Sequence, residues 1–169
     1  KVWSEVKDIL EKNTPESKNI FCRSNFRQMI NTEEINKDFQ KKIGDNYWHG
    51  LQHGIALLGH IPPLYQENSF YKRFLIPATY DSSSKNVKCA SYKTIDENFS
   101  VAGSQAIHHG FDHSRQEKLA SILSWSQKTY LRVCLKNNYA GSNCNNCEKC
   151  MRTIVGIKAL EGNPNDFGF

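Results

Sequence analysis

Three cysteines near the carboxyl terminus, spaced as C-x2-C-x2-C, constrain this 169-residue chain more than any other feature. They are Cys144, Cys147 and Cys150, and Cys134 precedes them by nine intervening residues. Four thiolates at this spacing can surround one tetrahedral zinc ion, because each two-residue step lets successive sulfurs face the same metal. The segment 137–143 is rich in Asn and Gly, which tolerate the backbone of tight metal loops. The spacing therefore predicts a zinc site.

The same thiols also allow disulfides or free thiols as alternatives. Disulfides need an oxidising compartment, and the amino terminus lacks the apolar stretch of a secretion signal. We therefore expect a cytoplasmic protein with one structural zinc, because four sulfur ligands leave no coordination position open for water. The two other cysteines are expected to have no such role, Cys22 being a core thiol in a strand and Cys89 an unpaired loop thiol.

The composition excludes several classes of protein. Hydrophobic residues make up 38% of the chain and charged residues 23%, which is typical of a globular domain rather than of a collagen, a coiled coil or a disordered chain. The longest apolar stretches are far shorter than the roughly 20 residues that span a membrane. A net charge of +5 suits anionic ligands such as nucleotides. The basic residues form no aromatic-rich cluster, so we do not expect a nucleic-acid partner.

Hydrophobic periodicity predicts alternating helices and strands. Apolar residues recur at helical spacing in four segments: 2–12, 47–59, 115–130 and 151–160. Short apolar runs predict three strands: 19–23, 70–77 and 131–135. The segment 32–44 is predicted to be a loop or weak helix, and 81–87 a loop. The alternation is typical of an α/β fold, a parallel sheet with flanking helices, here followed by a small carboxyl-terminal zinc-binding segment.

Candidate ligand-binding residues follow the first two expected strands, because parallel α/β sheets bind ligands beyond the carboxyl ends of their strands. Arg23 and Asn25 follow the first strand, Thr79 and Asp81 follow the second, and all four are expected to line one cleft. The segment 103–113 is expected to be a loop that covers this cleft, contributing Ser104, Gln105, His108 and His109. Two alternatives stay open. In the first, Arg23 caps a strand end instead of binding a phosphate or carboxylate. In the second, the segment 103–113 is only a surface connection and does not cover a cleft.

Histidines suggest a second metal hypothesis. His49 and His53 lie four residues apart on one face of an expected helix, as in metal-binding helices, but no Glu completes an H-E-x-x-H motif. The neighbouring Gly50 and Gly54 indicate close helix packing. We therefore favour solvated or core histidines over metal or substrate ligands.

The stretch LRVCLKNNYAGSNCNNCEKCMRTIVGI, residues 131–157, resembles the zinc-binding tail of the 7-cyano-7-deazaguanine synthase family. That family belongs to the PP-loop ATP pyrophosphatases, in the adenine-nucleotide α-hydrolase (HUP) group. There, as here, a strand ends in Cys, and C-x2-C-x2-C leads into a helix with a basic residue, here Arg152. Looser similarity covers about residues 18–160. IFCRSN resembles a strand that ends in an Arg-Asn pair, although Ser24 separates the two residues here, and IPATYD and SRQEKLASI resemble the next strand and a later helix.

The resemblance implies a Rossmann-like fold and an ATP-dependent enzyme with ATP and Mg²⁺ as cofactors. In such an enzyme, a carboxylate or amide oxygen of a small or nucleobase-like substrate attacks the α-phosphate of ATP and pyrophosphate leaves. An amine or ammonia then displaces AMP, while the protein positions the groups and stabilises charge. The family holds the pyrophosphate in an S-G-G-x-D-S loop. The 169 residues contain no such loop.

The chain opens inside the expected helix 2–12 with no capping residue before it, so we expect a fragment. Residues 1–131 are then the carboxyl-side part of a PP-loop domain that is incomplete at its amino terminus, and 132–169 the zinc-binding segment. The missing loop would come from an amino-terminal segment or another chain. Two alternatives remain: a non-catalytic zinc-ribbon-like module that binds nucleic acid or protein, and a structural subunit whose active site another chain completes.

Overall fold

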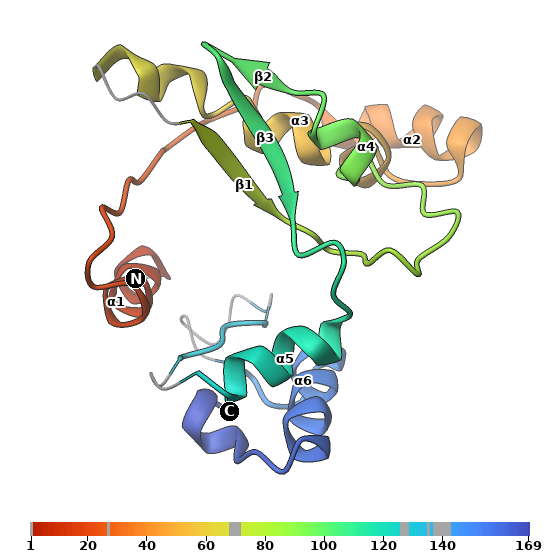
Figure 1. Ribbon diagram of the computed structural model, residues 1–169. Coiled ribbons are helices and arrows are strands. Elements are labelled where there is room, and N and C mark those ends of the chain that lie inside the picture. Colours follow the sequence, from red (N-terminus) through yellow and green to blue (C-terminus); the bar gives the residue numbers. More distant parts are fainter. Residues whose placement is uncertain (1, 27, 68–71, 126–128, 135, 137–142) are drawn as a thin grey trace. The chain divides into compact units, whose positions relative to one another are not determined.

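The structure, a computed structural model, describes residues 2–26, 28–67, 72–125, 129–134, 136 and 143–169. It is a mixed α/β protein with a small three-stranded sheet and flanking helices (Figure 1). The chain forms two compact units. The central unit spans residues 22–114, and the terminal unit combines residues 1–21 with 115–169.

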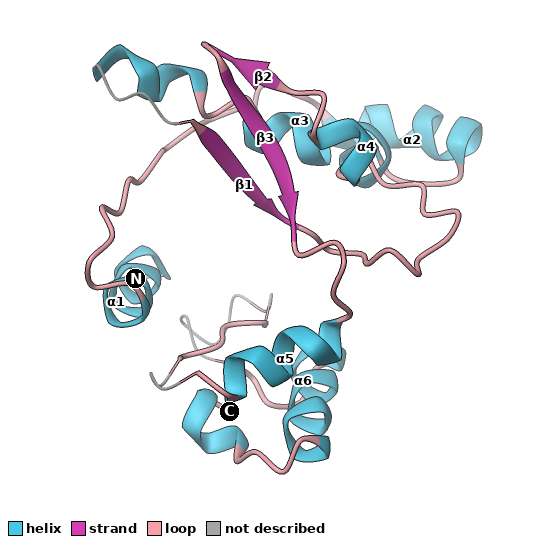
Figure 2. Cartoon of the chain, viewed as in Figure 1, coloured by secondary structure: helices cyan, strands magenta, loops and turns pink. Residues whose placement is uncertain are grey.

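The sheet belongs to the central unit and consists of β1 (Arg73–Pro77), β2 (Ser100–Val101) and β3 (Ser104–His109), in the order β1-β3-β2 (Figure 2). β1 and β3 are parallel, from Arg73 opposite Gln105 to Pro77 opposite His109, although the sequence analysis expected no strand at β3. β2 is antiparallel to β3. The expectation of a wholly parallel sheet is therefore wrong, and a Rossmann-like order is not established.

The expected lid over residues 103–113 is largely a strand. Residues of β3 alternate between buried and less buried positions, because successive side chains of a strand point to opposite faces. A two-residue turn joins β2 to β3, and both of its residues, Ala102 and Gly103, have positive φ angles of 48° and 80°. Such turns match the right-handed twist of a hairpin. The segment is thus fixed in the sheet and does not fold over a cleft.

The core of the central unit lies between the sheet and α3 (His53–Leu58). Leu58, Ile76 and Ala106 form the buried cluster, and Ile61 and Phe99 pack against it. The short helix α4 (Lys93–Asp96) packs against β3 and α3. The helix predicted over 47–59 is confirmed in its location, but its first half, η1 (Trp48–Gln52), is a π-helical turn. A 3₁₀ helix, η2 (Pro62–Glu67), follows α3 and begins with two prolines.

Capping explains why the segment 32–44, predicted to be a loop or weak helix, forms the regular helix α2 (Thr32–Ile43). The Asn31 side chain accepts a hydrogen bond from the backbone N–H of Glu34, which satisfies one free donor of the first turn. Gly44 ends the helix in the left-handed region at φ 73°. The two caps therefore stabilise α2, although the helix has few apolar residues to pack.

The strand predicted over 19–23 is wrong. This segment carries no strand, and Ile20 and Phe21 are each 44% exposed. An apolar run becomes a strand only when a neighbouring strand satisfies its backbone groups, and none of the described strands pairs with it. Cys22, expected in the core, is exposed for the same reason.

The terminal unit is helical in its described residues, with α1 (Val2–Asn13), α5 (Arg115–Leu123), α6 (Glu148–Ala159) and the 3₁₀ helix η4 (Pro164–Phe167). The predictions over 2–12 and 151–160 are confirmed, and the helix predicted over 115–130 ends at Leu123. The strand predicted over 131–135 is wrong for 131–134, which have no strand pairing. Leu135 lies outside the described residues.

Two long-range hydrogen bonds connect α1 to the cysteine-bearing segment. The Asn13 amide donates to the carbonyl of Tyr130, and the Tyr130 N–H donates back to the Asn13 side-chain oxygen, both over 3.2 Å. α5 packs against α6, and the Gln116 amide donates to the Gly156 carbonyl over 2.9 Å. The compact units are therefore divided differently from the predicted domains 1–131 and 132–169.

We predict that Gly54→Ala destabilises the central unit by about 1–3 kcal/mol, as overpacking of a core does. A Cβ at this position would lie 2.0 Å from Oδ1 of Asp96 and 2.9 Å from the Ala90 carbonyl oxygen. Gly59→Ala is the matched control, because its φ of −63° suits any residue and its nearest contact would be 3.1 Å. Urea unfolding of both variants measures the difference. Equal stabilities would show that the close approach of Gly54 to Asp96 is unimportant.

Candidate metal centre

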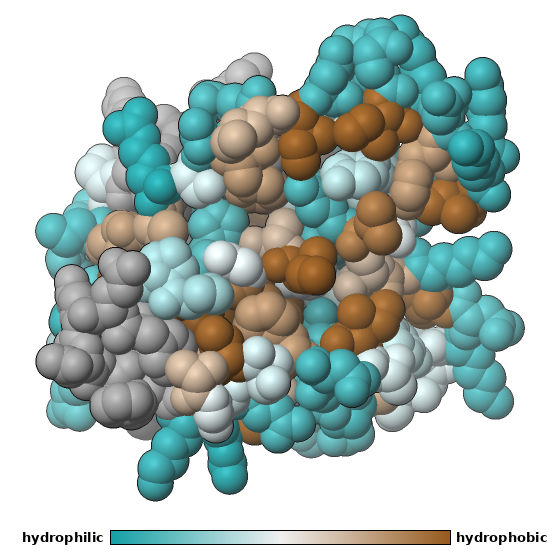
Figure 3. Space-filling view, turned by 90° about the horizontal axis from the view of Figure 1, so that it is seen from above, coloured by the Kyte–Doolittle hydropathy of each residue, from teal (hydrophilic) through white to brown (hydrophobic). Residues whose placement is uncertain are grey.

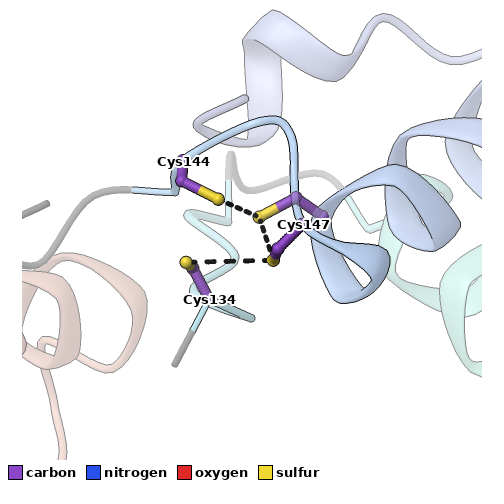
Figure 4. A group of neighbouring side chains, drawn as sticks. Cys134, Cys144 and Cys147 are labelled. Atoms are coloured by element: carbon purple, nitrogen blue, oxygen red, sulfur yellow. Dashed lines mark hydrogen bonds between the residues drawn. The ribbon is translucent and has the colours of Figure 1, made fainter. Parts of the chain in front are cut away.

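Four cysteines of the terminal unit converge on one point, as the spacing predicts. Cys134 ends the described segment 129–134, and Cys144 lies in the loop that leads to α6. Cys147 is the residue before the first turn of α6, and Cys150 lies within that turn. Figure 4 shows the side chains of Cys134, Cys144 and Cys147 pointing toward one another. Helix α6 thus holds two ligands rigidly, while the loops bring the other two.

The distances between the sulfurs fit a shared metal ion. The Sγ of Cys147 lies 3.4 Å from that of Cys150 and 4.0 Å from that of Cys134, and Cys144 lies 3.9 Å from Cys150. All four sulfurs are within 4.8 Å of one another. A tetrahedron with metal–sulfur bonds of about 2.3 Å has sulfur–sulfur edges of about 3.8 Å. A disulfide would need about 2.05 Å. The arrangement can therefore hold a metal ion such as zinc.

The surroundings of the sulfurs also suit a metal centre. Cys134 and Cys150 are fully buried, and Cys144 and Cys147 are partly buried, so the cluster is shielded on one side. The backbone N–H of Lys136 donates to the Cys134 sulfur over 3.4 Å. Hydrogen bonds of this kind orient metal ligands and stabilise the thiolate form.

Backbone donors and burial shift the pKa values of these thiols in opposite directions. The backbone N–H of Asn146 lowers the pKa of Cys144 to about 6, and that of Cys150 lowers the pKa of Cys147. Burial, with a contribution from the Cys147 side chain, raises the pKa of Cys150 to about 11. A divalent cation among the sulfurs reverses the last effect, because a coordinating thiol is deprotonated. The surroundings therefore favour the thiolate form at Cys144 and Cys147 and oppose it at Cys150, where a bound metal would offset the effect of burial.

Asn143 fixes the loop beside the cluster and was missed by the sequence analysis. Its buried side-chain oxygen accepts from the backbone N–H groups of Val133 and Cys134, over 3.0 and 3.3 Å. Its amide donates to the carbonyls of Leu131 and Gly168, over 2.6 and 3.0 Å. One side chain therefore ties the segment before Cys134 to the carboxyl terminus. The sequence feature that could have indicated this role is the position of Asn143 directly before Cys144 in an Asn-rich segment.

The other predicted site residues all lie in the central unit, and the structure brings only some of them together. Thr79 and Asp81 follow β1, beside the end of β3, where the Ala78 N–H donates to the His109 carbonyl over 2.8 Å. Asp81 accepts from the hydroxyls of Ser83 and Ser84, and the Ser83 bond lowers the pKa of Asp81. These contacts indicate a turn-stabilising carboxylate.

Arg23 and Asn25 lie in the segment that lacks the expected strand. Arg23 lines a hollow of about 770 Å³ together with Phe26, Tyr47 and His60. Neither Thr79 nor Asp81 borders this hollow. The cleft predicted from two parallel strand ends is therefore not formed there, because its first strand does not exist.

His108 and Ser104 are core residues of β3, whereas Gln105 and His109 are exposed. Nδ1 of His108 lies 2.8 Å from Oδ2 of Asp96, and the Ser91 hydroxyl donates to the same oxygen over 2.9 Å. The side chains of Asp96 and His108 are at most 1% exposed. This buried pair was missed by the sequence analysis, because a 12-residue separation gives no local signal. Its position argues for a structural role of His108 rather than substrate contact.

His49 and His53 do not share a metal site in the structure. His49 binds the Asp45 carboxylate through Nδ1 and lies 3.1 Å from the Tyr80 hydroxyl through Nε2. The bond from His49 lowers the pKa of Asp45. Nδ1 of His53 lies 3.6 Å from the Cys89 sulfur. Among the residues that the structure describes, the four-cysteine cluster alone could hold a metal.

Cys89 lies in a loop and is unpaired, as expected, and it is buried. Burial raises its pKa, which keeps the thiol protonated and argues against a nucleophile. It lines a second hollow of the central unit, of about 780 Å³, whose walls are mostly apolar and include Leu51, Ile55 and Ile95. These three side chains are among the exposed apolar residues of the chain. Figure 3 shows the face of the molecule seen from above, where apolar side chains are exposed between polar ones.

We predict that Asn143→Ala destabilises the metal-loaded terminal unit by about 2 kcal/mol, because it leaves four backbone groups, one buried and three partly buried, without their partner. Asn143→Asp keeps the two acceptor bonds but turns an anion toward the carbonyls of Leu131 and Gly168, so we expect a similar loss. Asn165→Ala, at an exposed position of η4, should stay within about 0.5 kcal/mol of the parent chain. Thermal unfolding compares the three. Parent-like stability of Asn143→Ala would contradict the role of this side chain.

Comparisons of the chain with protein-family models, with curated proteins and with solved structures gave no match. The candidate site therefore depends on its own geometry. Within the described part of the chain, no helix is long and apolar enough to cross a membrane.

Proposed function

We propose that the four cysteines bind one zinc ion and that this ion stabilises the terminal unit. The observation that carries the proposal is the approach of all four sulfurs to within 4.8 Å of one another from three separate parts of the chain. Zinc is the metal of choice for four thiolates in tetrahedral geometry. Four sulfur ligands leave no position for water or substrate, so the role is structural.

The terminal unit has few other sources of stability. Leu119 and Ile157 are its buried large apolar side chains among the described residues, and two of its other buried residues are the ligands Cys134 and Cys150. Binding of structural zinc supplies folding free energy of about 10–16 kcal/mol in small zinc domains. The metal would therefore replace much of the missing apolar core.

We predict about one zinc per chain after purification under reducing conditions. Cys147→Ala removes one ligand and should abolish tight zinc binding and the cooperative unfolding of the terminal unit. Cys22→Ala, an exposed thiol of the central unit, is the matched control and should keep its zinc. Elemental analysis and thermal unfolding measure both properties. A parent chain without zinc, or with these sulfurs paired as disulfides, would refute the metal site.

We also propose that the chain is the carboxyl-side part of a PP-loop ATP-dependent enzyme. The support is the cysteine tail, in which C-x2-C-x2-C leads into a helix that carries Arg152, and a parallel pair of strands whose carboxyl ends meet. The reaction would join a small carboxylate or amide to an amine or ammonia through an adenylated intermediate. The 169 residues contain no S-G-G-x-D-S loop. The loop that would bind the phosphates of ATP, with Mg²⁺, must therefore come from outside these residues.

We predict that this chain alone releases no pyrophosphate from ATP. Each missing backbone donor at a site of developing charge costs about 2.7–4 kcal/mol in comparable enzymes, and here a whole loop is missing. A polypeptide that supplies an S-G-G-x-D-S loop, in the same chain or as a partner, should restore release. Radiolabelled ATP gives the measurement. Release by the chain alone would contradict the proposal, and no release after completion would favour a non-catalytic zinc module.

A further inference from the structure

A small hollow in the terminal unit is surrounded by cations. Its volume is about 210 Å³, and the side chains around it are Arg115, Val133, Lys149, Arg152 and Thr153. Three of these five residues carry a positive charge and none carries a negative charge. A hollow with this lining is chemically distinct from the sulfur cluster, although Val133 and Lys149 neighbour the ligands Cys134 and Cys150 in the sequence.

Packed helices fix the backbone positions of the three cations, whose side chains are exposed. Arg115 is the first residue of α5, and Lys149 and Arg152 lie three residues apart on α6, which puts them on one face of that helix. The two helices contact each other, and the amide of Gln116, next to Arg115, donates to the Gly156 carbonyl over 2.9 Å. Sites on packed helices are held more precisely than sites on loops.

Most of the positive charge around the hollow is not neutralised. Arg152 forms an exposed ion pair with Glu148, which engages one of its five N–H donors. Within the described residues, Arg115 and Lys149 form no ion pair at all. The Thr153 hydroxyl donates to the Lys149 carbonyl over 2.9 Å, so it offers only its oxygen to a ligand. The available donors are therefore two guanidinium groups and one ammonium group.

We propose that this hollow binds the phosphate group of a small molecule. Guanidinium groups match the geometry of phosphate oxygens through paired hydrogen bonds, and lysine adds a compact charge. The small volume suits one phosphate group, so the remainder of a larger molecule such as a nucleotide would lie outside. The proposal goes beyond the structural zinc, and its test measures binding directly and does not depend on ATP turnover.

The test adds ligand stepwise to the zinc-loaded 169-residue chain at constant ionic strength. NMR spectra monitor binding through the amide signals of α5 and α6. Orthophosphate, pyrophosphate and AMP are the ligands, and chloride is the control anion. We expect saturable shifts at Arg115, Lys149 and Arg152 with the phosphate compounds alone. Tighter binding of AMP than of orthophosphate would identify a nucleotide as the source, and equal binding would identify free phosphate.

Variants distinguish a phosphate site from general electrostatic attraction. Lys149→Ala and Arg115→Ala should each weaken phosphate binding about tenfold, the effect of losing one charge-assisted hydrogen bond. Lys158→Ala removes the same charge from an exposed position near the other end of α6 and should leave the affinity unchanged. An equal loss in Lys158→Ala would overturn the proposal, and so would an equal response to chloride.

Zinc content is measured in every variant, because the cations could serve only to balance the thiolates. Arg115→Ala with full zinc but weakened phosphate binding supports the proposal. A parent chain that does not bind phosphate, combined with variants that lose zinc, would show that the cations stabilise the sulfur cluster instead and would overturn it.

Discussion

Burial of cysteine thiols is the constraint on which the terminal unit depends. Its buried residues include Cys134 and Cys150, so the place that an apolar core would occupy is partly filled by groups that ionise. Without a cation, burial, with a contribution from the Cys147 side chain, raises the pKa of Cys150 to about 11. With a divalent cation, the same four sulfurs attract one centre and connect three parts of the chain. Asn143 then keeps the backbone before Cys134 in position.

The central unit also buries polar groups, namely the carboxyl group of Asp96 and the imidazole of His108. Asp96 is enclosed by the Ser91 hydroxyl, by His108 and by the close approach of Gly54, where a Cβ would lie 2.0 Å from the carboxylate. Removing one partner of such a pair would leave an uncompensated buried charge, which costs more than the pair contributes. Helix α3, helix α4 and strand β3 are therefore held in one arrangement by a polar contact in addition to the apolar cluster at Leu58.

Local patterns predicted the parts of the fold that local interactions decide. The helices α1 and α6, the strand β1 and the four cysteines followed from periodicity and spacing. The errors concern pairing between distant segments. The run 19–23 resembles a strand in sequence but pairs with none of the described strands, whereas β3, with two adjacent histidines, resembles a loop in sequence but lies between two strands. Burial of His108 depends on Asp96, and this partner cannot be identified from sequence spacing.

Charge at the start of α6 connects the metal centre to the cationic hollow. Lys149 and Arg152 lie near the amino end of this helix, where the helix dipole is positive and added cations are unfavourable. Such a placement needs negative charge nearby. A zinc ion with four thiolates carries a net charge of about −2 and supplies part of it from Cys147 and Cys150. Arg115, the first residue of α5, adds a third cation and also lines the hollow. Glu148 supplies further negative charge, but it pairs with Arg152, and within the described residues Arg115 and Lys149 form no ion pair, so their donors stay available to a phosphate.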